Sequence, residues 1–224
     1  PVNDRDFSEV SALTKSQATS KHEQYSQEIR YAGKVTEKIN GVVGVYAHSQ
    51  TLKGIDQKEE TGKDQWRFVQ TSKTGTQALL STPGLLNNYG TNTNSKLNSL
   101  STAAFAQADW EFLKGFHVLP GVRFTYDKKE ADFSRLTYGG LQTTDPKLLA
   151  LKKSVYADQV FSTGTTNQNL AGNITLSYRP NEKLNTFATY STAYKPVGIN
   201  IGGLPTNTKG EADLTVAVVK PEYV

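Results

Sequence analysis

Side chains that could carry acid–base or metal chemistry are few and scattered. Histidine occurs 3 times in 224 residues, at His22, His48 and His117, and cysteine does not occur. No two histidines have the spacing of a zinc-binding helix such as HExxH. Without cysteine the chain forms no disulfide, thiolate site or cysteine nucleophile. The sequence therefore predicts no metal site and no cofactor.

Other arrangements typical of enzymes are also missing. Glu59 and Glu60 are adjacent carboxylates, but they stand in a polar stretch where acids are usually solvated rather than paired as general acid and base. The glycine pairs in 138–140 and 201–203 lack the Lys and Ser or Thr of a phosphate-binding loop, and no Gly-x-Ser-x-Gly elbow occurs. We therefore expect no catalytic residues and no enzyme activity.

A second set of charged residues recurs at alternate positions inside apolar stretches: Glu28, Arg30, Asp109, Glu111, Arg123 and Arg179. Alternate positions of a strand lie on one face, so each charge shares a face with polar neighbours. In a membrane barrel that face lines the lumen, because a charge is costly against lipid. We expect these side chains to pair with one another or with a lumen plug more often than with a passing solute.

The stretches that position these charges alternate strictly. From Phe116 to Asp127 the even positions are Phe, Val, Pro, Val, Phe and Tyr, and 168–179 follows the same rule. A period of two indicates a β-strand with one apolar and one wet face. A tilted strand of about eleven residues crosses the roughly 25 Å apolar band of an outer membrane. The pattern predicts the wall of a transmembrane β-barrel.

Composition agrees with this interpretation. Hydrophobic residues make up 36% of the chain and the mean hydropathy is -0.52. No run approaches about eighteen consecutive apolar residues, which excludes helical membrane spans but suits strands with a polar lumen face. The net charge of +4 is spread along the chain without a basic block. We therefore expect no nucleic-acid partner.

Strands and connections follow in a regular order. We expect six strands, at 25–32, 42–48, 102–112, 116–127, 169–178 and 184–194. Short turns at Lys38-Ile39-Asn40-Gly41, Lys114-Gly115 and 179–183 alternate with long polar loops at 49–100 and 128–166. Outer-membrane barrels place short turns in the periplasm and long loops outside. The expected fold is all-β: an antiparallel up-and-down meander that forms a partial transmembrane barrel wall, with short periplasmic turns and long extracellular loops.

Ligand recognition in such a barrel would fall in the long loops. Their aromatic residues are the candidates by location: Trp66, Phe68, Tyr89, Tyr138 and Tyr156. Aromatic side chains in a long loop also pack that loop on itself. The sequence leaves both roles open.

An ordered set of short motifs resembles the barrel domain of TonB-dependent outer-membrane receptors. The motifs are SQEIR at 26–30, GVY at 44–46, GVRFTYD at 121–127, LSYRPN at 176–181, FATYSTAYKP at 187–196 with Gly198 and Asn200, and KPE at 220–222. The resemblance covers nearly the whole chain. It implies a 22-stranded barrel whose lumen is closed by a plug domain.

The resemblance also sets expectations for the whole receptor. We expect residues 1–224 to be a middle segment of the barrel, with six to seven strands and with the plug and C-terminal strands absent. Its expected location is the bacterial outer membrane. Its expected partners are outer-membrane lipid, the TonB complex acting through a plug absent from this chain, and a small-molecule or iron-chelate ligand.

The expected function is TonB-energised uptake of a scarce solute, such as a ferric siderophore, a cobalamin or an oligosaccharide. One alternative is a passive porin-like or structural outer-membrane barrel. A plug domain in the parent sequence would distinguish the receptor from this alternative. Another is a soluble antiparallel β binding module, which would be monomeric without detergent.

Overall fold

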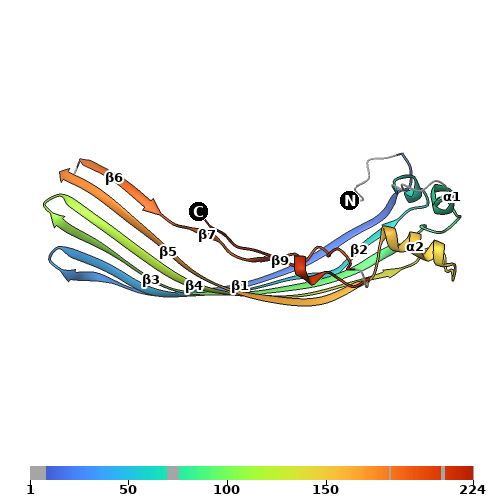
Figure 1. The fold of residues 1–224 in the computed structure, drawn as a ribbon, viewed down its shortest axis with the longest axis horizontal. Helices are drawn as coiled ribbons and strands as arrows, with labels where there is room; N and C mark the ends of the chain where they lie inside the picture. Colours follow the sequence, from blue (N-terminus) through green and yellow to red (C-terminus); the bar gives the residue numbers. More distant parts are fainter. Residues whose placement is uncertain (1–8, 70–75, 182, 208–209, 224) are drawn as a thin grey trace.

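One curved antiparallel sheet makes up most of the molecule. The computed structural model describes residues 9–69, 76–181, 183–207 and 210–223. Six strands follow one another in the sheet in the order of the chain (Figure 1). They are β1 (Leu13–Thr36), β2 (Ile39–Thr61), β3 (Gly90–Leu113), β4 (Phe116–Tyr138), β5 (Gln159–Asn181) and β6 (Leu184–Ser191). The expected up-and-down meander is confirmed, as an open sheet with β1 and β6 at its edges.

The first five strands are about two to three times as long as the alternation indicated. Each has 23 or 24 residues. The expected loops at 49–100 and 128–166 are therefore wrong at both ends: the connections span only 62–89 and 139–158. In the added halves most positions on both faces are polar and apolar residues such as Phe133 and Phe161 are few, so a period of two in hydropathy does not reveal the strand. Cross-strand pairs such as Thr51 Oγ1 to Asn98 Oδ1, at 3.0 Å, support the pairing there.

The hairpin turns lie together at one end of the sheet, called here the turn end. The expected turn at Lys38-Ile39-Asn40-Gly41 is wrong, because Asn40 and Gly41 pair with Lys34 and Gly33 inside the strands. The chain reverses instead between Thr36 and Ile39. The turn at Lys114-Gly115 lies where expected. Gly115 has φ +76°, and a Cβ there would stand 2.8 Å from the carbonyl oxygen of Arg179, so this position requires glycine.

The two faces of the sheet differ in chemistry. The cross-strand register places one row of apolar residues on the convex face: Ile29, Val45, Ala104, Phe124 and Leu170. The next row falls on the concave face: Arg30, Gly44, Phe105, Arg123 and Ala171. Because the side-chain period is two, a slip of one residue would exchange the rows.

Large apolar side chains are exposed along a band on the convex face. Its members include Tyr31 at 74%, Val43 at 56%, Leu170 at 68% and Tyr190 at 71% exposed. The band begins at the turn end with stacked rings, since Phe116 and Tyr178 have centroids 4.3 Å apart. It fades after the rows of Tyr126 and Tyr25. This is about ten residues per strand, the length needed for an apolar outer-membrane band.

A segment after β6 leaves the sheet and crosses its concave face (Figure 1). β6 pairs with β5 only along Asn173–Asn181 and ends at Ser191, three residues before the expected end at Tyr194. The segment, called here the strap, comprises residues 194–207 and 210–223. It contains β7 (Tyr194–Lys195), β8 (Gly198–Ile199), η2 (Leu214–Val216), β9 (Val218–Val219) and β10 (Glu222–Tyr223), with β8 paired to β9 and β10 to β7.

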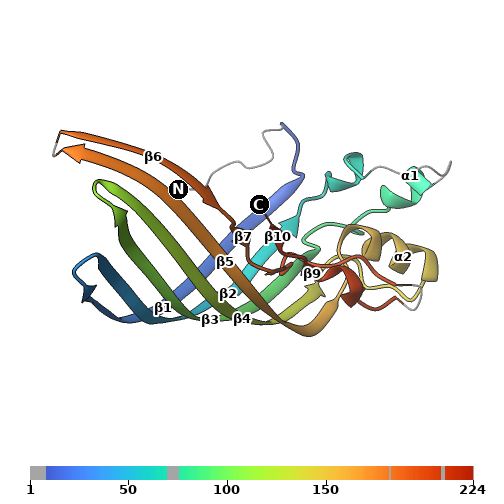
Figure 2. The ribbon, with the colours of Figure 1, turned by 60° about the vertical axis from the view of Figure 1, so that its left-hand side comes forward.

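The opposite end of the sheet carries two connections that fold together, as Figures 1 and 2 show. This loop cap comprises residues 62–69, 76–89 and 139–158. It holds η1 (Gln65–Arg67), α1 (Thr76–Leu80) and α2 (Pro146–Val155). The Asp145 side chain caps α2 by accepting a hydrogen bond from the amide of Lys147 at 2.8 Å, and Pro146 opens the helix. None of the helices in the described ranges is long and apolar enough to cross a membrane.

The loop cap has a hydrophobic core of its own. Its fully covered residues are Leu80, Leu85, Leu86 and Tyr89, with Trp66, Val69, Leu141, Leu148, Leu151, Val155 and Tyr156 packed around them. Burial of apolar side chains stabilises the cap as it would a small soluble domain. The two connections are therefore joined by packing rather than left as independent loops.

We predict that Leu85→Ala opens the loop cap. Leu85 is 0% exposed, and removal of a buried leucine side chain costs about 2–5 kcal/mol. The expected result is cleavage of the cap by protease at least about tenfold faster, since cleavage follows the population of the open form. Leu79→Ala is the matched control, because Leu79 in α1 is 39% exposed. Equal cleavage rates for the two variants would contradict a packed core.

Candidate functional site

The concave face carries every charged residue that the alternation assigned to the wet face. Glu28, Arg30, Asp109, Glu111, Arg123 and Arg179 all fall in rows on this side of the sheet. They do not form a single cluster. Asp109, Glu111 and Arg179 lie at the turn end, while Glu28, Arg30 and Arg123 lie midway along the strands. The strap lies against the same face beyond them.

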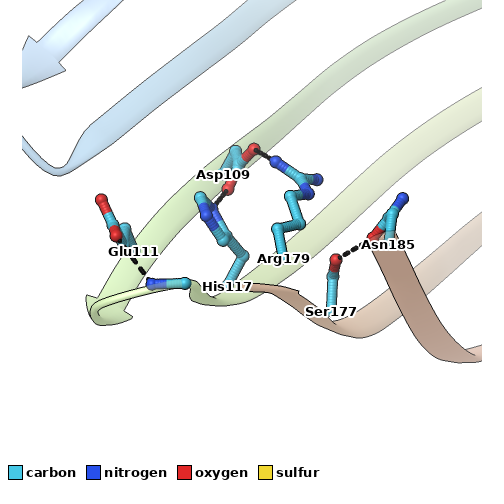
Figure 3. Close-up of polar contacts among 7 residues, drawn as sticks. Asp109, Glu111, His117, Ser177, Arg179 and Asn185 are labelled. Carbon is cyan, nitrogen blue, oxygen red and sulfur yellow. Dashed lines mark hydrogen bonds and ion pairs between the residues drawn. The ribbon is translucent and has the colours of Figure 1, made fainter. Parts of the chain in front are cut away.

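At the turn end an ion-pair cluster joins three strands (Figure 3). Asp109 on β3 accepts at Oδ1 from His117 Nδ1 of β4 at 2.6 Å and at Oδ2 from Arg179 Nη1 of β5 at 3.1 Å. Glu111 accepts from the amide of Gly115 at 2.9 Å, which fixes the adjoining turn. One carboxylate thus links β3, β4 and β5, which locks the register of the two hairpins.

The cluster does not have the geometry of a hydrolase. Ser177 stands opposite His117 in the register, so Asp109, His117 and Ser177 have the residue types of a catalytic triad. However, the Ser177 hydroxyl donates to Asn185 Oδ1 at 2.8 Å and is 2% exposed. The arginine shares the carboxylate that would have to orient the histidine. A buried hydroxyl with its hydrogen committed elsewhere is not an accessible nucleophile.

Midway along the sheet an arginine lies between two aromatic rings. The guanidinium carbon of Arg123 is 5.4 Å from the ring centre of Tyr46 and 5.8 Å from that of Phe105. The Phe105 ring lies across Gly44, where a Cβ would come within 2.5 Å of it. Glycine at 44 therefore creates the space for the ring. Nearby, Arg30 and Glu28 pair at 3.6 Å.

Tyr46 and Phe105 were absent from the residues that the sequence singled out. The available signal was an aromatic residue at a wet-face position, one strand from Arg123 for Phe105 and two strands from it for Tyr46. Cation–π contact of this kind holds a guanidinium in place while leaving its edge available for an anion. The concave face therefore presents a positioned positive charge rather than a mobile one.

The strap covers the concave face of β4 and β5 nearer the loop cap. Tyr194 donates to Asp127 Oδ2 at 2.6 Å, and Asp127 is 4% exposed. The Gln159 side chain donates to the carbonyl of Leu204 at 2.8 Å and accepts from its amide at 2.9 Å. Phe133, Phe161, Leu204 and Ala217 form a second buried cluster. The strap is thus fixed to the wall by polar contacts and by an apolar cluster.

The loop aromatic residues divide into packed and exposed ones. Tyr89 packs in the core of the loop cap and donates to the carbonyl of Tyr156 at 2.7 Å. Tyr156 approaches Glu59 Oε2 at 3.4 Å, and Tyr138 donates to Glu60 Oε1 at 2.8 Å. Trp66 is partly buried against the core, whereas Phe68 is 53% exposed. Of these candidates, Phe68 alone presents most of its ring area to solvent.

A buried lysine closes the base of the loop cap. Lys152 of α2 donates to the carbonyls of Gly139 and Leu141, both at 3.0 Å, and lies 4.7 Å from the centre of the Tyr89 ring. Burial lowers the pKa of the Lys152 amine. Its positive charge is held by carbonyl dipoles and a ring face rather than by a carboxylate. This links the second connection to the first.

Electrostatics of the cap favour neutral tyrosines. Burial, with a smaller contribution from the Glu59 carboxylate, raises the pKa of Tyr156 to about 12, and burial raises the pKa of Tyr89. Within the described residues no group of three or more His, Asp or Glu side chains could hold a metal ion.

The sheet, its long meander and its polar concave face define a wall of the membrane-barrel type. A family model for the "TonB dependent receptor-like, beta-barrel" domain matches residues 3–224. The chain therefore belongs to the TonB-dependent receptor β-barrel family.

A solved structure supports the same fold. The ferric yersiniabactin uptake receptor FyuA from Yersinia pestis matches with a TM-score of 0.59 and 16% sequence identity. The match covers 93% of this chain and 25% of that one, so the chain spans about a quarter of the receptor's length. No curated protein matches the sequence. Family members of this type are transporters of the outer membrane rather than enzymes.

We predict that the loop cap loosens at high pH through Tyr156. Its pKa in the folded chain is about 12, against about 10 in an unfolded chain. The stabilising contribution is complete below pH 10 and is lost as the pH rises through 12. Absorbance of tyrosinate and protease cleavage of the cap, both followed against pH, measure the two consequences.

Tyr156→Phe is the matched variant. It should remove one absorbance step near pH 12 and leave the step near pH 10 unchanged, and cleavage of its cap should depend less on pH between those values. Loss of amplitude near pH 10 instead would show that Tyr156 titrates like an exposed tyrosine and that the cap does not bury it.

Proposed function

We propose that this chain forms part of the wall of an outer-membrane receptor that takes up a scarce solute with energy relayed through TonB. The observation that carries the proposal is that one face of the sheet is apolar and the opposite face is charged. The convex face exposes an apolar band about ten residues long per strand, as lipid requires, and the concave face carries fixed charges. Membership of the receptor family supports the direction of transport.

The proposed orientation of the wall in the membrane follows from the different lengths of the connections at the two ends of the sheet. Short turns of outer-membrane barrels lie in the periplasm and long connections lie outside. The turn end is then periplasmic, with the cluster of Asp109, His117 and Arg179 at the lower rim of the lumen. The strands continue beyond the apolar band and carry the loop cap clear of the membrane on the cell exterior.

The ligand chemistry that fits best is an anionic chelate of small size. Arg123, held between Tyr46 and Phe105, and Arg30 offer positive charge on the concave face. Phe68 offers an exposed ring at the cap. These groups would suit a ferric siderophore better than a neutral oligosaccharide, and a cobalamin remains within the same receptor class. The fold neighbour from Yersinia pestis is a ferric yersiniabactin uptake receptor, and the proposal extends that class of ligand to this chain.

The wall residues have separate proposed roles. The rigid loop cap captures the solute, because its core removes the cost of ordering a flexible loop on binding. A plug pulled by TonB then opens the lumen. Solute passing inward meets the strap first and the arginines of the mid-wall next. The cluster at the turn end holds the lower rim in register while the plug moves.

We predict TonB-dependent uptake by the intact receptor. Cells that carry it should bind a radioactive ferric siderophore with or without TonB, but should accumulate iron only when TonB is present. A membrane-impermeant chelator would strip surface-bound iron and separate the two signals. Uptake that persists without TonB would favour a passive porin-like barrel, and a receptor recovered in the soluble fraction would favour a soluble β module.

Phe68→Ala is expected to weaken surface binding of the siderophore about tenfold, because an aromatic contact contributes on the order of 1 kcal/mol beyond its buried area. The maximal rate of uptake should stay unchanged. Leu79→Ala, at another exposed position of the cap, is the control for general disturbance. Equal binding by wild type and the Phe68 variant would remove Phe68 from the ligand site and leave Arg123 and Arg30 as the candidates.

A further inference from the structure

The half of β5 nearer the loop cap is paired on one side only (Figure 1). β4 pairs with β5 along nearly its whole length, whereas β6 pairs with it only along Asn173–Asn181. Just beyond β6, the amide of Thr192 donates to the carbonyl of Gly172 at 2.8 Å. In the described part of the chain no strand adjoins this side of β5 from there to the loop cap. We call the unpaired side of residues 160–170 the open edge.

The open edge presents a regular row of main-chain donors and acceptors. The carbonyl of Gly172 points toward β6, and because successive residues of a strand alternate, the even positions beyond it point their N–H and C=O groups the same way. The even positions are all exposed: Val160, Ser162, Gly164, Thr166, Gln168 and Leu170. The odd positions bond to β4 instead. A row of this kind matches the backbone of another extended chain.

The open edge lacks the usual protection against pairing. Natural sheet edges are blunted by lysine, by proline or by a β-bulge. β5 has no charged residue and no proline in 159–178, and its register with β4 shows no shift. By contrast β1, at the other edge of the sheet, carries Lys15, Lys21 and Glu23 and has three register shifts against β2. The sequence of β5 therefore leaves its edge competent to add a strand.

The strap does not close the open edge, although it continues directly from β6. If β6 kept its register, Pro196 would stand opposite Gln168. Proline has no N–H and cannot donate to the carbonyl there. The strap turns instead onto the concave face, where Leu204 lies in one buried cluster with Phe161. It thus covers the concave side of β5 and leaves the open edge reachable from the convex side.

Charges near the open edge are matched within the wall. Glu130 of β4 pairs with Lys128 at 2.8 Å. Asp132 accepts from the Ser162 hydroxyl at 2.7 Å and stands opposite Lys96. A strongly basic or acidic partner therefore gains little here, and the open edge favours an uncharged segment.

Gly164 lies in the middle of the open edge and leaves a gap between the side chains on its convex side. A Cβ there would stand 3.5 Å from the Cγ of Glu130, which is ordinary contact, so the gap is bounded by β4. An aromatic ring on an added strand would cover such a glycine. Threonine or valine would match Ser162 and Thr166 on either side, as cross-strand pairs do. The best occupant is thus an uncharged extended segment with one aromatic residue.

A second copy of the receptor does not fit the open edge. Two barrels in one membrane are related by an axis along the membrane normal, so their β5 strands would cross at about 80° for a strand tilt near 40°. Paired strands are rotated by only about 20–25°. Residues 160–166 also lie beyond the apolar band, on the side of the loop cap. The occupant therefore arrives from the aqueous side rather than through the lipid.

We propose that the open edge binds an extended, uncharged segment of a secreted polypeptide by strand addition. The segment would run antiparallel to β5, in line with β6, with its aromatic residue opposite Gly164. Main-chain hydrogen bonds would supply most of the affinity. This interaction goes beyond solute uptake, and it rests on the proposed orientation only for the side of the membrane from which the segment arrives.

The test uses the intact receptor in nanodiscs and a synthetic peptide as long as the open edge, with alternating threonine and valine around a central tyrosine. Fluorescence anisotropy measures peptide binding, and hydrogen exchange measures the protection of single amides. The amides at even positions should exchange freely in the receptor alone and at least about tenfold more slowly with peptide bound. A peptide N-methylated at the residues that face β5 should not bind.

Thr166→Pro removes one N–H from the open edge and leaves the bonds of the odd positions to β4 in place. It should weaken peptide binding roughly tenfold or more, because a hydrogen bond is lost and the ring obstructs the added strand. Thr166→Ala is the matched control: it loses the side chain, keeps the N–H and should bind like wild type. Slow exchange of the odd amides in both variants checks that β5 still pairs with β4.

Protection of the even amides before peptide is added would overturn the proposal, because another segment of the receptor would then occupy the edge. Absence of peptide binding, or equal binding of the N-methylated peptide, would overturn it without any variant. Binding in nanodiscs but not on intact cells would support strand addition and contradict the proposed orientation. Uptake of solute is not measured, so a failure of the proposed transport function is separate from each of these outcomes.

Discussion

The register of the sheet within its apolar band is the constraint on which the rest of the structure depends. Inside hydrocarbon every backbone N–H and C=O must pair with a neighbouring strand, because no water is present to replace a lost bond. The period of two then links the faces: if Val45, Ala104 and Phe124 face lipid, Arg123 and Arg30 must face inward. Asp109 reinforces this register by joining three strands at the turn end.

The apolar band and the loop cap are stabilised in different ways. In the proposed membrane location the band needs no hydrophobic core, because lipid would supply its apolar surroundings. The loop cap stands in water and must bury its own core, which Leu85 and Tyr89 do with α2 packed beside them. Lys152 completes it by satisfying two carbonyl groups of the second connection. A rigid cap above a register-locked wall is a suitable platform for ligand capture, because little ordering remains to be paid on binding.

The sequence predicted the strands where one face is apolar and the other polar, and missed their continuation where most residues of both faces are polar. The alternation of 116–127 located the band half of β4, but Lys128 to Tyr138 continue the strand with mostly polar residues and no sustained alternation. Asn40-Gly41 has the composition of a tight turn, yet cross-strand pairing moved the reversal to the residues after Thr36. Arg123 was identified from its position, whereas its contact with Phe105 depends on the side-chain space above Gly44 and could not be deduced from spacing.

The most direct test of this account is oxygen accessibility along β4 in the intact receptor. Single cysteines bearing a spin label would be placed at each position from Leu119 to Ser134 and measured in lipid bilayers. We predict that oxygen accessibility is high at even positions and low at odd positions up to Tyr126. From Glu130 onward the even positions should report water, while positions 131 and 133 stay shielded under the strap. Accessibility without a period of two before Tyr126, or lipid contact continuing through Asp132, would contradict the proposed band.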